Sequence, residues 1–469
     1  MLALHDTATG EVAPLALRTP GQIGVYVCGP TVDGVPHLGH GRMTLVFDVL
    51  RRYLIFSGLA VTFVSNVTDI EDKIIDRAAE KGIPISEFTA ANEARWWEIM
   101  DALGVLRPDL TPHATAYVER MIDLVGELVA RNLAYETATG VYLSVLDVPG
   151  YGLLARQPLD SLRAGARIEA DEEKRSPLDF VLWKKAKAGE PSWEAPWGAG
   201  RPGWHTECVV MSLDLLGEGF DLHGGGIDLM FPHHENERAQ AVASGKEFAR
   251  HWMHNGWVTM DGEKMSKSLG NFTSLADLLE RNDARAYRLL VLRSHYRSPI
   301  EVTPETIAQA EAGLARLDEM ARRFSLGNVL DEGPVVNAAS GAASAGGSGL
   351  DGDAVAQFVE RMDNDLDTPG ALALIFDLVR QANGAADGGH DDRAHTLART
   401  AAWLAAGLGL PLEPGGAAEV DEESEALARA RDDARAAKDW AAADALRTEL
   451  ESRGWVVEDS AEGTRIRRA

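Results

Sequence analysis

The sequence has little cysteine, no long apolar run and no excess of positive charge. Two cysteines among 469 residues exclude a disulfide-stabilised scaffold, and we expect a protein of the reducing cytoplasm. No apolar segment reaches the ~18 residues of a membrane span. The first residues, MLALHDTATGEV, lack the basic segment and apolar core of a signal peptide. Neither a membrane partner nor a signal peptide is therefore expected.

The charge balance is strongly acidic, with a formal net charge of −26. Such a balance disfavours nonspecific adhesion to nucleic acids or membranes, although a local basic surface can still bind one nucleic acid. The composition is otherwise that of a globular protein, with 45% hydrophobic and 25% charged residues. At ~100–200 residues per domain, the length predicts two to four domains.

The N-terminal region alternates strand and helix patterns. Residues 23–28 (IGVYVC) indicate a buried strand, residues 37–58 a long helix, and residues 60–66 (AVTFVSN) a second strand. Another helix pattern follows, with Thr68 or Asp69 as its expected N-cap. Strand, helix and strand in this order form a βαβ unit, so we expect an α/β fold with a doubly wound parallel sheet.

Composition divides the rest of the chain. A stretch rich in glycine, proline and tryptophan near 187–204 indicates an insertion, and residues 331–350 indicate a flexible linker or, alternatively, a long surface loop. A predominantly acidic helical segment precedes a tail of mixed charge. We expect the chain to divide into five parts, of which the first is discontinuous: 1–110 with 204–250, 111–203, 251–310, 311–424 and 425–469.

Four distant residues carry metal-ligand chemistry. His233 and Glu237 stand four apart, on one face of a helix that we expect to begin at the preceding proline. With Cys28 and Cys208 they form a plausible ligand set for tetrahedral zinc. The neighbouring His234 offers no second ligand in this spacing. Without a CxxC motif, the alternative is that both cysteines are small buried hydrophobic residues.

Two short motifs suit phosphate chemistry. The tetrapeptide HLGH (37–40) opens the first long helix, where free backbone N–H groups and the helix dipole favour an anion. The pentapeptide KMSKS (264–268) is bordered by glycines and could clamp a pyrophosphate. The alternatives are exposed loop histidines and a solvated charged turn.

Together these residues give the chain a close resemblance to the cysteinyl-tRNA synthetases, a family of class I aminoacyl-tRNA synthetases. HLGH stands where that class has its HIGH signature, and KMSKS is unchanged. Segments such as YVCGPTV, NVTDIEDKI, FVLWK and HGGGIDLMFPHHENE resemble the family's blocks in the same order. The tail segment ARAAKDWAAADALR resembles its C-terminal domain.

The resemblance implies a division of labour among the segments. It makes 1–110 and 204–250 a Rossmann-like catalytic domain, 111–203 a connective-peptide insertion and 251–310 a stem-contact region carrying KMSKS. Residues 311–424 would be a helical domain, and 425–469 a small anticodon-binding domain. The implied substrates are L-cysteine, ATP with Mg²⁺ and tRNA(Cys), and a monomer is expected.

The resemblance also assigns site residues, with one zinc ion per chain. The zinc ligands would be Cys28, Cys208, His233 and Glu237. The groups that stabilise the transition state of adenylate formation would be His37, His40, Lys264 and Lys267. ATP would be bound by His37, Gly39, His40, Asp228 and Lys267. The cysteine pocket would be lined by Thr68, Trp204, His205 and His223.

A basic stretch in the tail is the expected tRNA contact. Arg435, Lys438 and Trp440 are the candidates, because basic groups bind phosphates and a tryptophan can stack on an unpaired base. The alternative is an amphipathic helix pair that packs on its neighbour, since the charges there are mixed.

Three rival functions remain open at this point. The cysteine ligase of mycothiol synthesis resembles the same catalytic core but couples cysteine to an amino sugar and lacks the tail domain. A zinc-dependent RNA-binding module without catalytic activity would not need the KMSKS motif. A nucleotidylyltransferase of the HxGH type would leave the cysteines unexplained.

Overall fold

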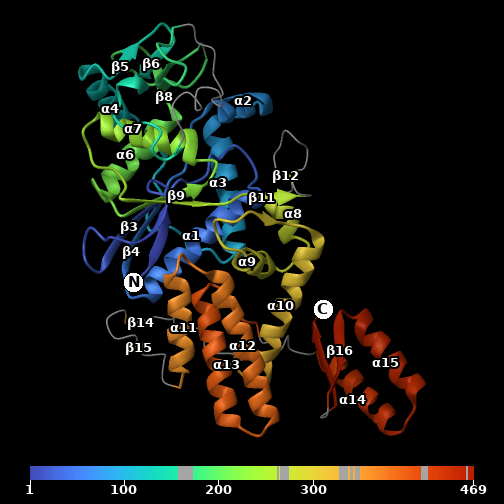
Figure 1. The fold of residues 1–469 in the computed structure, drawn as a ribbon. Coiled ribbons are helices and arrows are strands. Elements are labelled where there is room, and N and C mark those ends of the chain that lie inside the picture. The colour runs from blue at the N-terminus through green and yellow to red at the C-terminus, as the bar shows by residue number, and fades with distance from the viewer. Residues whose placement is uncertain are drawn as a thin grey trace.

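The protein consists of an α/β half, a helical bundle below it and a small C-terminal unit (Figure 1). In this computed structural model the described residues are 1–156, 173–187, 189–260, 263–264, 274–326, 336–337, 342–343, 349–413, 421–460 and 463–468.

A four-stranded parallel sheet lies at the centre of the α/β half. Its strand order is β10 (His251–Asn255), β9 (Leu222–Gly226), β3 (Gln22–Val27) and β4 (Ala60–Ser65). Helix α1 (Leu38–Phe56) connects β3 to β4, which confirms the expected βαβ unit and fold class. We expected the catalytic segment to end at 250, whereas the sheet continues through β10.

Both faces of this sheet are buried, and alternate residues of β3 enter different cores. Ile23, Val25 and Val27 belong to the core that includes α1. Tyr26 and Cys28 belong to the opposite core, which is covered by α6 (Trp204–Leu216) and α7 (Glu235–Ala243). Because side chains alternate along a strand, this register places Cys28 on the face that also holds Cys208.

The second helix begins later than the sequence predicts. Helix α2 (Asp72–Lys81) has Glu71 as its N-cap, with the carboxylate accepting from the Lys73 amide, so the expectation of Thr68 or Asp69 was wrong. Asp69 instead accepts hydrogen bonds from the amide and hydroxyl of Thr115. A carboxylate held by this distant segment is not available to cap the helix.

Smaller elements surround the parallel sheet. The N-terminal hairpin consists of β1 (Ala3–Asp6) and β2 (Glu11–Pro14), and α3 (Ile85–Ala102) follows α2. The next elements are η1 (Ala114–Tyr117), α4 (Val118–Ala130), β5 (Ala134–Glu136), β6 (Gly140–Leu143), η2 (Val145–Asp147), β7 (Phe180–Lys185) and β8 (Gly200–Pro202). The four strands β5 to β8 form one sheet in sequence order, within the expected insertion.

The segment after the parallel sheet contains a break that the sequence pattern did not predict. The apolar spacing of residues 275–295 predicts one helix, whereas the structure contains two, α8 (Leu275–Leu279) and α9 (Ala284–Leu292). Asp283 causes the new start, because its carboxylate accepts from the Arg285 amide as an N-cap. The neighbouring elements are β11 (Val258–Met260), β12 (Glu263–Lys264), β13 (Ile300–Glu301) and α10 (Pro304–Arg323).

The lower bundle shares one core with α1. Its helices are α11 (Gly352–Asp363), α12 (Thr368–Asp387) and α13 (Asp391–Gly407). Phe56 of α1 packs on Phe358 and Trp403, with ring centroids 5.4 and 5.1 Å away. Within the predicted linker, the structure describes β14 (Val336–Asn337), β15 (Ala342–Ala343) and residues 349–350, while the rest of that prediction lies outside the described residues.

The C-terminal unit has a small core of its own. Two helices, α14 (Glu422–Ala436) and α15 (Trp440–Ser452), cover a hairpin of β16 (Trp455–Ser460) and β17 (Gly463–Arg468). Its core cluster consists of Ala428, Leu450, Trp455 and Val457. Among the described residues of the chain, each helix is too short or too polar to cross a bilayer.

Candidate functional site

The four predicted zinc ligands come together in the buried layer between the parallel sheet and its covering helices. Cys28 follows β3, and Cys208 lies in α6. His233 lies in a π-helical turn, η3 (Met230–His234), and Glu237 lies in the first turn of α7. All four side chains are buried, and their ligand atoms lie within 4.8 Å of one another.

Four distances among these atoms match the edges of a tetrahedron around one metal ion. The two Sγ atoms are 3.6 Å apart, and Cys208 Sγ is 3.7 Å from His233 Nε2. Cys28 Sγ is 3.5 Å from Glu237 Oε1, which is 3.1 Å from His233 Nε2. Zinc bonds of standard length predict about 3.8 Å between sulfurs and about 3.5 Å between sulfur and nitrogen. The residues present therefore fit a zinc ion.

The outer nitrogen of His233 is also fixed, as is usual for a metal-binding histidine. His233 Nδ1 lies 2.8 Å from Nδ1 of His205, so Nε2 is left facing the sulfurs. Trp204 stacks on the same ring with centroids 4.1 Å apart. Two predicted pocket residues, Trp204 and His205, thus contact a predicted metal ligand directly.

Burial sets the protonation states of this cluster. Burial raises the pKa of the Cys28 thiol. A hydrogen bond with Cys28 lowers the pKa of Cys208, but burial and the charge of Glu237 outweigh it and raise that pKa to about 11. Burial lowers the pKa of His233 well below its usual value and that of His205 to about 3. The histidines are therefore neutral, which is the form that binds metals, and a cation is needed to hold both sulfurs as thiolates.

His234 is the main residue that the sequence analysis missed. It was expected to offer no ligand, but its Nε2 lies 3.3 Å from Cys28 Sγ. Together with His223 it completes a second possible metal-binding group that shares Cys28 and Glu237. Both histidines of the HH pair thus reach a cysteine sulfur, and they lie in a π-helical turn in which Phe231 departs from helical geometry. The doubled histidine was the available signal.

A chain of hydrogen bonds fixes the orientation of His234. Its Nδ1 lies 2.8 Å from His254 Nε2, and His254 Nδ1 lies 2.7 Å from the Thr7 hydroxyl. His254 is in β10, and burial lowers its pKa to about 3. An N-terminal loop residue thus reaches the cysteine cluster through two neutral imidazoles, a link that no short sequence motif reveals.

The other two predicted pocket residues lie around the same cluster. His223 Nε2 is 2.7 Å from Glu237 Oε2, and its ring stacks on Trp252. Thr68 is buried and donates to Glu207 Oε2 at 2.6 Å. Glu207 was not predicted; burial raises the pKa of its carboxyl group, and its position beside Cys208 was the only sequence signal.

The HLGH tetrapeptide forms the start of α1. His37 is the N-cap, and a reciprocal pair of hydrogen bonds joins its ring and amide to the amide and ring of His40. The two rings stack with centroids 3.7 Å apart, and Trp96 packs edge-on against His40. A Cβ atom on Gly39 would lie 2.9 Å from His37 Cε1, so glycine permits this compact arrangement.

The segment that begins at Ser274, beyond the KMSKS motif, contacts the residues around HLGH. Ser274 forms a β-bridge with His37, and the Leu275 amide donates to the Pro36 carbonyl. Lys264 lies in β12, opposite Thr259 of β11. Lys267 lies outside the described residues. Residues 274 and 275 thus contact the start of the HLGH helix, although more than 200 residues separate them from it in sequence.

The remaining predicted residues lie apart from the cluster. Asp228 is exposed, just beyond the carboxyl end of β9. Arg435 lies in the last turn of α14, Lys438 has a positive φ of 60° in the following turn, and Trp440 begins α15 with 60% of its surface exposed. These three residues share one end of the C-terminal helix pair.

Family models match almost the whole chain in three consecutive parts. Residues 15–312 match the catalytic domain of class I (C) tRNA synthetases. Residues 357–413 match the DALR domain, and residues 417–467 match the cysteinyl-tRNA ligase anticodon binding domain.

Full-length relatives and solved structures agree with these matches. The chain is 46% identical to a cysteine–tRNA ligase from Halorhodospira halophila and 45% identical to one from Chromobacterium violaceum, each over 100% of both chains. A solved methionyl-tRNA synthetase from Mycobacterium tuberculosis, in complex with methionyl-adenylate, superimposes with a TM-score of 0.60 at 18% identity. That match covers 85% of this chain and 93% of the other. At this identity, the likeness extends to the fold.

Proposed function

The chain belongs to the cysteine–tRNA ligase family of class I synthetases, and from this premise we propose that it activates L-cysteine with ATP and transfers it to tRNA(Cys). The reaction has two steps. The cysteine carboxylate attacks the α-phosphorus of ATP, which forms cysteinyl-adenylate and releases pyrophosphate. The terminal ribose hydroxyl of the tRNA then attacks the adenylate carbonyl and releases AMP.

The proposed specificity for cysteine rests on one observation. Two sulfurs, one imidazole and one carboxylate lie within 4.8 Å of one another in a buried layer, at tetrahedral distances. We assign Cys28, Cys208, His233 and Glu237 as the ligands of one zinc ion, oriented by His205 and Trp204. When bound, zinc supplies a soft acceptor for the substrate thiolate.

This chemistry addresses a discrimination that pocket shape alone handles poorly. Serine differs from cysteine by one atom, and a shape-based pocket typically separates such small groups by ~1–3 kcal/mol. A thiol with a pKa near 8.5 ionises far more readily than a hydroxyl. Trp204 and His205 contact the proposed ligand His233, and His223 contacts the proposed ligand Glu237, so all three proposed pocket residues adjoin the cluster.

The HLGH helix start is the proposed phosphate site. The rings of His37 and His40 stack on each other at a helix N-terminus, and Gly39 lies between the two residues in sequence. N–H groups at this position are proposed to stabilise the charge on the transferring phosphoryl group. Lys264 and Lys267 are proposed to neutralise the pyrophosphate together with Mg²⁺, and Asp228 to bind the ribose. The bridge between Ser274 and His37 supports this pairing of the two motifs.

The C-terminal unit is the proposed anticodon contact, through Arg435, Lys438 and Trp440. Its match to an anticodon binding domain supports this role, and the exposed Trp440 offers a stacking surface. The same match disfavours the cysteine ligase of mycothiol synthesis, which lacks such a domain. The intact HLGH and KMSKS motifs disfavour a module that only binds RNA.

The direct test is ATP–pyrophosphate exchange with cysteine and with serine, followed by charging of tRNA(Cys). We expect exchange that depends on cysteine, at least 1000-fold selectivity over serine by kcat/KM, and loss of exchange after zinc removal. Serine activation comparable to cysteine would refute the zinc assignment. Exchange without charging of tRNA, but with coupling to an amino sugar, would refute the ligase assignment.

A further inference from the structure

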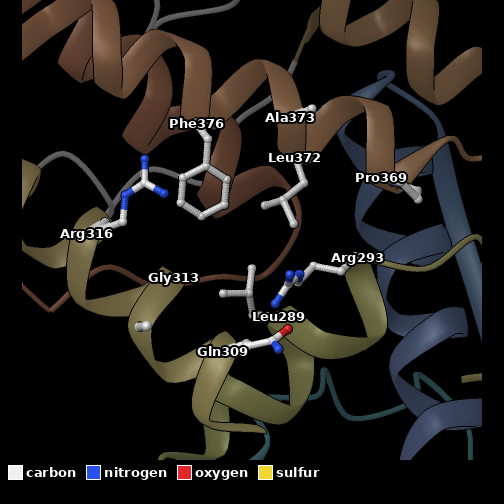
Figure 2. A pocket seen from close by; sticks show the side chains of 10 residues that line it. Leu289, Arg293, Gln309, Gly313, Arg316, Pro369, Leu372, Ala373 and Phe376 are labelled. Carbon is white, nitrogen blue, oxygen red and sulfur yellow. The ribbon is translucent and has the colours of Figure 1, made fainter. Parts of the chain in front are cut away.

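A second cavity lies far from the cysteine cluster, between α9, α10 and α12 (Figure 2). Its volume is about 460 Å³, which is large enough for one nucleotide. Leu289, Leu372 and Phe376 provide an apolar floor, and the side chains of Arg293 and Arg316 lie on either side of it. The function proposed above assigns no role to this cavity.

The charge of the cavity is opposite to that of the protein. None of its ten lining residues is acidic, whereas the whole chain has 72 acidic and 46 basic residues. Arg293 and Arg316 are both exposed, and among the described residues neither guanidinium group forms a side-chain hydrogen bond or an ion pair. By contrast, Arg380 on α12 pairs with Asp377. Two unpaired guanidinium groups on one cavity suit a phosphate group.

The apolar floor suits a planar ring. The guanidinium of Arg316 lies over the ring of Phe376, 5.2 Å from its centroid, so arginine and phenylalanine are already stacked. Bases that leave a stack bind to aromatic faces and to arginine planes in this way. Gln309 on the same wall has an amide that can both donate to and accept from a base edge.

We propose that this cavity binds one nucleotide of the bound tRNA, with the base on the Leu289–Phe376 floor and the phosphate between Arg293 and Arg316. The proposal rests on the proposed function, because the occupant is the same tRNA. Leu289 and Gln309 fall in the part matched to the catalytic domain, and Leu372 and Phe376 in the DALR part. A tRNA held at its 3′ end by the catalytic domain and at its anticodon by the C-terminal unit has to pass the helices that join them.

The experiment measures direct binding of tRNA(Cys) to the full chain at several salt concentrations, together with cysteine-dependent exchange. R293A/R316A removes the charges, and Ala373→Trp fills the cavity from its exposed rim without changing charge. Arg380→Ala is the matched control for loss of positive charge on the same helices. Exchange within twofold of the wild type shows that each variant folds.

We expect R293A/R316A to weaken tRNA binding about 10- to 100-fold and to reduce the salt slope by about 1 for each lost phosphate contact. Ala373→Trp should weaken binding about tenfold with little change of salt slope, and Arg380→Ala should change neither.

Unchanged tRNA binding in R293A/R316A or in Ala373→Trp would overturn the proposal. Saturable binding of free AMP at the cavity, without an effect of the variants on tRNA, would identify a free nucleotide as the occupant and would also overturn it. Failure of the proposed function gives a different result, because the wild type itself would then lack cysteine-dependent exchange.

Discussion

The cysteine cluster and the surfaces proposed to bind tRNA are built in opposite ways. In the cluster, Cys28, Cys208, His233 and Glu237 are buried, and most of their polar atoms contact one another or a neighbouring imidazole. The α9–α10–α12 cavity and the C-terminal helix pair instead present exposed groups. A small substrate has to be distinguished by chemistry in a rigid, dry site, whereas a long polyanion is bound by many exposed contacts of modest strength.

The largest expected effect is loss of a buried ligand. Cys208→Ser should release zinc and lower cysteine-dependent exchange at least 1000-fold, because a hydroxyl is a poor ligand for this metal. Binding of tRNA should change less than threefold if the two regions are independent. Metal analysis and exchange are the measurements, with Ser212→Ala on the same helix α6 as the control. Normal zinc content in the Cys208 variant would contradict the assignment of Cys208 as a zinc ligand.

A buried ion pair holds the HLGH helix to the helix that follows KMSKS. Arg288 of α9 donates to Asp48 Oδ2 of α1 at 2.5 Å, with both side chains 1% exposed. Arg288→Met should lower the free energy of unfolding by ~3–5 kcal/mol, because Asp48 would be left buried with one partner fewer. Chemical denaturation measures this, and a loss below ~1 kcal/mol would contradict it.

The same pair predicts a pH dependence of stability. Burial raises the pKa of Asp48, but the charges of Arg288 and Arg52 outweigh it, so the folded-state pKa lies below the ordinary value. The contribution of Asp48 is therefore complete above its unfolded pKa of ~4 and is lost as the pH falls through its folded pKa. Stability below pH 4 should decline less steeply in Arg288→Met than in the wild type.

A smaller effect is expected at the outer partner of a ligand. His205→Phe removes the hydrogen bond to His233 Nδ1 and should weaken zinc affinity about 10- to 100-fold. Competition with a chelator measures the affinity. The exchange rate should recover at saturating zinc, which distinguishes a positioning role from direct contact with the substrate. Unchanged zinc affinity would assign His205 to the cysteine pocket alone.

The smallest effect on activation is expected from the C-terminal unit. Its core of Ala428, Leu450, Trp455 and Val457 is separate from the other cores. A chain ending at 413 should therefore keep cysteine-dependent exchange within twofold, while KM for tRNA(Cys) rises about tenfold or more. Equal losses in exchange and charging would show that the two regions are not independent.

The sequence predicted the residues of the cluster better than their surroundings. The strand before Cys28 and the spacing of His233 and Glu237 are local patterns that the sequence shows directly. In the structure these three residues meet Cys208, as predicted. His234 was missed because a partner was sought four residues away, whereas its partners Cys28 and His223 come from elements distant in sequence. The links from Thr7 through His254, and from Ser274 to His37, join distant segments and depend on tertiary packing.

The predicted helix boundaries were wrong for equally specific reasons. Asp69 is a good N-cap by residue type, but Thr115 holds its carboxylate, and Glu71 caps the helix instead. Asp283 did act as an N-cap, and it divided a continuous apolar pattern into α8 and α9. Propensity thus identified suitable residues, and tertiary contacts decided which of them were available.

X-ray absorption at the zinc edge, with and without bound cysteine, tests whether the buried cluster binds zinc and whether that zinc binds the substrate sulfur. We expect two sulfur ligands at about 2.3 Å with nitrogen and oxygen at about 2.0–2.2 Å in the free protein, and a third sulfur when cysteine binds. The serine-bound sample should keep two sulfurs. Active protein without zinc, or a spectrum unchanged by cysteine, would contradict the account.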